Sequence, residues 1–64
     1  MNIDPVELFG AELVTPKAKG QVIAQLQLLS VSAAIKRTTY ARWCELADVP
    51  KDDIDFRAVT RKVI

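Results

Sequence analysis

Basic side chains gather in the middle of this chain, in the stretch AAIKRTTYARWCELADVP that covers residues 33–50. Lys36, Arg37 and Arg42 occur there without an intervening acid, and Thr38 adds a hydroxyl group. Ammonium and guanidinium groups bind the phosphates of nucleic acids, and arginine also binds the edge of guanine. This stretch therefore predicts binding to duplex DNA.

The sequence carries no pattern typical of catalysis or of metal binding. It has no histidine, one cysteine (Cys44) and no glycine-rich phosphate loop. Asp52, Asp53 and Asp55 lack the ligand spacing and the glycine of a calcium loop, and we expect them at a solvated helix start. Cys44 is expected to be a small buried apolar residue. We predict no enzymatic activity, no cofactor and no metal site.

Length and composition limit the architecture. The chain has 64 residues, 50% of them hydrophobic, and a formal net charge of +1. A chain this short forms a single domain, residues 1–64, and buries only a modest fraction of its surface. One cysteine and no histidine leave neither an internal disulfide nor a zinc site to stabilise it. We therefore expect good helix packing together with self-association as a homodimer.

No segment has the pattern of a targeting or membrane-spanning sequence. The N-terminal residues MNIDPVELFG lack the basic region and apolar run of a signal peptide. Glutamines and serines interrupt the longest apolar window, so no segment is expected to span a membrane. With its lone thiol, the protein is expected in the cytoplasm, without a membrane partner.

Signals for helices follow one another along the chain. Asp4 and Thr15 each precede a proline, which is the pattern of an N-cap followed by the first helical position. Residues 17–34 are rich in helix formers with apolar residues on one face, which favours one long helix. Thr38 is expected to begin a further helix, and residues 56–64 fit either helix or strand. The fold prediction is an all-α bundle of three to five short helices, with a C-terminal tail that can be extended.

The basic stretch also has the spacing of a helix-turn-helix. Such a unit needs a small residue where its helices cross, a turn four residues later, and apolar residues that hold the second helix against the core. Ser30 and Ala34 occupy the first two places, and Ile35, Tyr40 and Trp43 follow at the apolar positions. The side chains between them point outward, where they can enter a major groove. The candidate DNA-binding residues are Lys36, Arg37, Thr38, Thr39, Ala41 and Arg42.

Over residues 26–56 the chain resembles the helix-turn-helix of small phage repressors of the Cro type. In that family a tryptophan often closes the recognition helix and a Val-Pro or Ile-Pro step opens the next helix, as in RWCELADVP here. The resemblance implies a phage or prophage transcriptional regulator that binds double-stranded DNA. It requires a break near Ala34, whereas the pattern over residues 17–34 is continuous, and both arrangements stay open.

Within this hypothesis each polar residue has a separate role. Thr38 is expected to cap the recognition helix and bring its positive end near a phosphate. Lys36 and Arg37 are expected to hold the DNA backbone, and Arg42 to reach a base edge.

A plain helical hairpin with Tyr40 and Trp43 facing inward fits the same residues. The basic residues would then form a solvated face, and the chain would be a protein-interaction module. Such a module could be a phage-encoded inhibitor or assembly factor that binds a host or virion protein. The predicted dimer interface in either case consists of Leu28, Val31 and Ile35.

Overall fold

Helices make up the regular structure of residues 3–61, the part of the chain that the computed structural model describes. The α-helices are α1 (Pro5–Phe9), α2 (Lys19–Leu28), α3 (Ala33–Ala47) and α4 (Phe56–Thr60). Short 3-10 helices are η1 (Ala11–Leu13), η2 (Pro16–Ala18) and η3 (Lys51–Asp53). No strand occurs among the described residues, so the prediction of an all-α fold with three to five short helices is confirmed.

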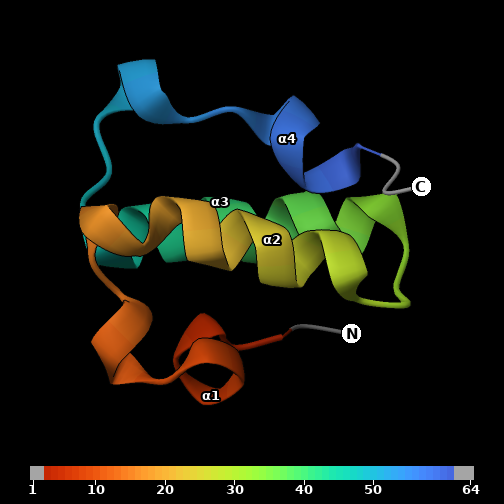
Figure 1. Cartoon of the computed structure of the whole chain (residues 1–64), viewed down its shortest axis with the longest axis horizontal. Helices are drawn as coiled ribbons and strands as arrows, with labels where there is room; N and C mark the ends of the chain where they lie inside the picture. The colour runs from red at the N-terminus through yellow and green to blue at the C-terminus, as the bar shows by residue number, and fades with distance from the viewer. Residues whose placement is uncertain (1–2, 62–64) are drawn as a thin grey trace.

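The helices form a central pair with a shorter helix on either side (Figure 1). α3 returns against the direction of α2 and packs against it, while α1 and α4 cover α3 from opposite sides. Two long-range hydrogen bonds tie the C-terminal segment to α2. The Gln27 side-chain amide donates to the Ala58 carbonyl at 2.7 Å, and Lys19 Nζ donates to the Asp53 carbonyl at 3.1 Å.

The chain between α2 and α3 turns earlier than the sequence indicated. α2 ends at Leu28, so residues 17–34 do not form one continuous helix. Ser32 then adopts an extended conformation and its hydroxyl accepts a hydrogen bond from the Ile35 backbone N–H at 3.2 Å. A serine at this position satisfies a backbone donor that has no partner within the helix. The turn therefore lies at residues 29–32, before the predicted turn at Ala34.

The start of the following helix was also predicted wrongly. Thr38 lies inside α3, which has already begun at Ala33, so it caps no helix. At its other end α3 stops where Asp48 adopts a left-handed conformation, with φ at 58°. The Asp48 N–H bonds to the carbonyls of the last turn, as is usual where a helix ends in this way.

The core is organised around the inner face of α3. Tyr40 and Trp43 are fully buried, and their rings stack with centroids 5.9 Å apart. Trp43 Nε1 donates to the Leu13 carbonyl at 2.8 Å, and the Tyr40 hydroxyl accepts from the Asp55 N–H at 3.3 Å. Phe56 meets the Tyr40 ring edge-on at 5.5 Å. One helix thus holds both the N-terminal and the C-terminal segments in place.

The C-terminal segment is helical up to Thr60, and Arg61 after it adopts an extended conformation. Asp55 begins α4 by accepting a hydrogen bond from the Arg57 backbone N–H at 3.1 Å, and Val59 is fully buried. The predicted extended tail falls in part on residues 62–64, which lie outside the described residues.

Candidate functional site

Four of the six predicted DNA-binding residues lie together on one side of α3. Thr39, Tyr40, Trp43, Cys44 and Ala47 are buried, so the opposite side of this 15-residue helix faces away from the core. Arg37, Thr38 and Arg42 are exposed there, and Ala41 is half-buried between them. We call this surface the α3 outer face, which consists of Ala34, Arg37, Thr38, Ala41, Arg42 and Glu45.

Lys36 is directed toward α2 rather than toward the α3 outer face. Its Nζ donates to the Gln27 carbonyl at 3.2 Å, and the side chain is half-buried. Carbonyls in the last turn of a helix lack intrahelical partners, and a cation there also interacts favourably with the helix dipole. Lys36 therefore helps to close the C-terminal end of α2.

Thr39 lies on the inner side of α3. It is 2% exposed, and its hydroxyl donates to the Ile35 carbonyl at 2.7 Å within the same helix. A residue enclosed in this way has no access to a ligand at the surface.

Acidic groups border the α3 outer face at its C-terminal half. Arg42 lies at a surface hollow that Asp4, Val6, Glu45 and Leu46 also line. The carboxylates lower the local positive potential, whereas Arg37 lies more than a helical turn away from Glu45. The part of the face farthest from these carboxylates is therefore its N-terminal half, which carries Arg37.

Two titratable groups lie behind this face, in the core. Burial raises the pKa of the Cys44 thiol, an effect that its hydrogen bond with Tyr40 and the charge of Lys19 partly oppose. Burial also raises the pKa of the Tyr40 hydroxyl, against the lowering effect of its hydrogen bond with the Asp55 backbone. Both groups are therefore held neutral, as expected for Cys44 as a small buried residue.

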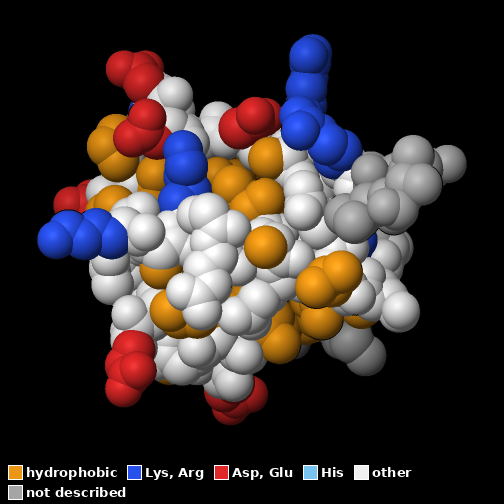
Figure 2. Space-filling view, in the orientation of Figure 1, with side chains coloured by type: hydrophobic (Ala, Val, Ile, Leu, Met, Phe, Trp, Pro, Cys, Tyr) orange, Lys and Arg blue, Asp and Glu red, His pale blue; other side chains and the backbone are white. Residues whose placement is uncertain are grey.

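The predicted dimer-interface residues differ in exposure. Leu28 is 74% exposed at the end of α2, whereas Val31 and Ile35 are half-buried. In Figure 2 the surface over the second half of α2 shows hydrophobic and uncharged atoms, and the charged side chains lie away from it.

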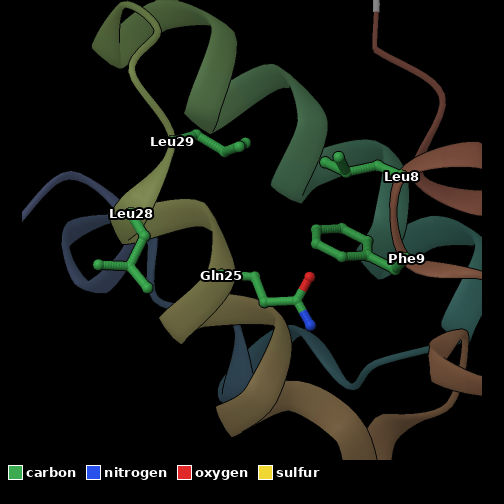
Figure 3. A pocket seen from close by; sticks show the side chains of 5 residues that line it. All are labelled: Leu8, Phe9, Gln25, Leu28 and Leu29. Atoms are coloured by element: carbon green, nitrogen blue, oxygen red, sulfur yellow. The ribbon is translucent and has the colours of Figure 1, made fainter.

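A hollow of about 180 Å³ lies beside Leu28 (Figure 3). The residues that line it are Leu8, Phe9, Gln25, Leu28 and Leu29. Sequence reasoning found only Leu28 of this group. Leu8 and Phe9 belong to α1, and their position beside α2 depends on the path of the chain through η1 and η2, for which the apolar spacing gives no signal.

Other kinds of site find no support in the described residues. Within residues 3–61, no group of three histidine, cysteine, aspartate or glutamate side chains is placed to hold a metal ion. No helix in this part of the chain has the length and apolar character needed to cross a membrane. Comparisons of the chain with models of protein families, with curated proteins and with solved structures found no match.

Proposed function

We propose that this protein is a small helix-turn-helix DNA-binding protein that acts as a cytoplasmic transcriptional regulator of a phage or prophage. The observation that carries the proposal is the exposed face of α3, the helix that follows the turn after α2, where Arg37, Thr38 and Arg42 lie away from the buried residues. In helix-turn-helix proteins the second helix of the unit enters the major groove.

The positions of the two arginines suggest how the groove would be bound. A helix of 15 residues is about 22 Å long, and the major groove of B-DNA admits an α-helix. Arg42 follows Thr38 by one helical turn, so the two side chains can share one line of contact with base edges. Arg37 lies at the margin of the α3 outer face and is assigned to a phosphate. Lys36 and Thr39 have no part in this version of the interface.

Salt dependence of binding to a labelled duplex of about 20 base pairs tests the proposal directly. Each phosphate contact contributes a slope of about −0.9 to a plot of log K against log salt, so the single phosphate contact of Arg37 predicts a slope of about −0.9. Fluorescence anisotropy between low and physiological salt measures it. Absence of binding to the duplex at micromolar protein and low salt would contradict the proposal.

Single substitutions assign the binding to the α3 outer face. Arg42→Ala should cost roughly 1–3 kcal/mol at a preferred sequence and reduce sequence discrimination, because a base contact is lost. Glu45→Gln should strengthen binding, because it removes an acid from the same face. Lys17→Ala is the control, since Lys17 is exposed in η2 and outside the face. If it weakens binding as much as Arg42→Ala, the attraction is general and not a property of α3.

The exposed Leu28 beside an apolar hollow favours a second candidate function, a protein-interaction module. A host or virion protein, or a second copy of the chain, would then cover this surface. Capture of partners from a host lysate with and without nuclease separates the two functions, since nuclease removes partners held through nucleic acid.

A further inference from the structure

The outward side of α2 carries no charge. Val22 and Leu26 are fully buried, and the residues opposite them occur at positions i, i+3, i+4 and i+7. We call this surface the α2 outer face, which consists of Gln21, Ala24, Gln25 and Leu28. Although 27% of the chain is charged, no charged residue occurs anywhere in residues 20–35. Soluble surfaces are normally rich in charged side chains, whereas the centres of protein interfaces are depleted of them.

A lack of charge suits one kind of partner in particular, a second copy of the same chain. In a two-fold symmetric dimer the same patch comes from both copies, so residues near the axis meet their own symmetry mates. A charged residue there would face a like charge, which is unfavourable. An uncharged face avoids this repulsion, and Ala24 near its centre is small enough to let two helices approach closely.

The hollow beside α2 supplies a place for the residue that protrudes most. In Figure 3 the Leu28 side chain points away from the space between Leu8, Phe9, Gln25 and Leu29. Apolar cavities of about 150 Å³ accommodate a molecule the size of benzene. A hollow of about 180 Å³ therefore has room for the four carbons of a leucine side chain. We propose that two copies pair through their α2 outer faces, with each Leu28 inserted into the hollow of the other copy.

A stable dimer would need more area than the hollow provides, so the whole α2 outer face would have to take part. A standard interface buries about 800 Å² of each partner, which is roughly one-sixth of the 4552 Å² accessible surface of this protein. The hollow alone cannot provide this area. The α2 outer face and the uncharged turn at residues 29–32 continue directly from it, and Leu28 lies where the helix meets the turn.

The proposal rests on the second candidate function, the protein-interaction module, and names a second copy of the chain as its partner. It does not depend on DNA binding. Sedimentation of the wild-type protein from micromolar to millimolar concentration should follow a monomer–dimer equilibrium. Leu28→Gln should raise the dimer dissociation constant by about 100-fold. A symmetric interface buries one Leu28 from each copy, so the substitution removes two buried leucines from every dimer. Leu28 is exposed in the single chain, so the circular dichroism spectrum should not change.

Leu46→Gln is the matched control, because Leu46 is 52% exposed on α3 at a different hollow. Its dissociation constant should equal that of the wild type. A wild-type protein that remains monomeric at millimolar concentration would overturn the proposal, as would equal effects of the two substitutions. If a monomeric wild type still captures another protein in a Leu28-dependent manner, the interaction function stands and the second copy is not its occupant.

Discussion

α2 and α3 are consecutive helices whose buried faces serve one core, yet their outer faces differ in chemistry. The α2 outer face presents glutamine, alanine and leucine, whereas the α3 outer face presents Arg37, Arg42 and Glu45. The inner residues determine how the helices pack and place few demands on the residues opposite them. The outer faces are therefore free to differ, and we propose a different partner for each. An uncharged face fits a copy of itself, while an arginine-bearing face fits a polyanion.

Trp43→Ala should have the largest effect, since it removes the core residue on which both outer faces depend. Trp43 is fully buried and donates to the Leu13 carbonyl, so truncation leaves a cavity and removes this hydrogen bond. Substitutions of this kind cost about 3–5 kcal/mol, which is a large part of the stability of a small domain. Thermal unfolding followed by circular dichroism should show a variant largely unfolded at 25 °C.

Trp43→Phe provides the comparison for this experiment. It keeps an aromatic ring against Tyr40 but removes the Nε1 donor, so its loss of stability should be smaller. Both self-association and DNA binding should disappear in Trp43→Ala and persist in Trp43→Phe. Retention of either activity by an unfolded Trp43→Ala chain would show that the corresponding outer face does not require this fold.

The inner face of α3 could be predicted from the sequence because large apolar residues recur at helical spacing. Tyr40, Trp43 and Cys44 were expected inside and are buried. The start of the helix could not be predicted in this way, because Ser32 and Thr38 are both suitable N-caps. Ser32 becomes the cap in the structure, and the helix formers that follow it extend α3 toward the N-terminus.

The surfaces were harder to predict than the core. Leu28 is exposed, but the hollow beside it depends on Leu8, which comes from a distant part of the chain. The direction of Lys36 depends on a carbonyl of the preceding helix, so a basic residue that appeared outward in the sequence instead contacts α2. Both features arise from packing between segments, which residue spacing along one helix does not encode.

Ser32→Ala should have a smaller effect, and it tests the junction at which the two helices meet. Loss of an N-cap costs about 1 kcal/mol, and this cost should appear as a lower urea midpoint with an unchanged slope. Thr38→Ala is the matched control, because Thr38 is exposed within α3 and alanine favours a helix interior. Its stability should equal or exceed that of the wild type. If Thr38→Ala is the more destabilising of the two, α3 begins at Thr38 in solution, as the sequence first indicated.

Alkaline pH should have the smallest effect, because it acts only on the inner face of α3 and leaves both outer faces unaltered. Burial raises the pKa of the Cys44 thiol, so the folded protein favours the neutral form more strongly than the unfolded chain does. The stabilisation is complete below the pKa of an unfolded cysteine, about 8.5, and is lost as the pH rises through the interval up to the folded pKa. Tyr40 acts in the same direction at higher pH.

Urea unfolding followed by Trp43 fluorescence should therefore show decreasing stability from about pH 8.5 upward. Cys44→Ala lacks the thiol, so its stability should fall less steeply up to the pH at which tyrosine and lysine begin to titrate. Parallel curves for the two proteins would mean that the thiol has the same pKa in the folded and unfolded states, which would contradict its burial against Tyr40.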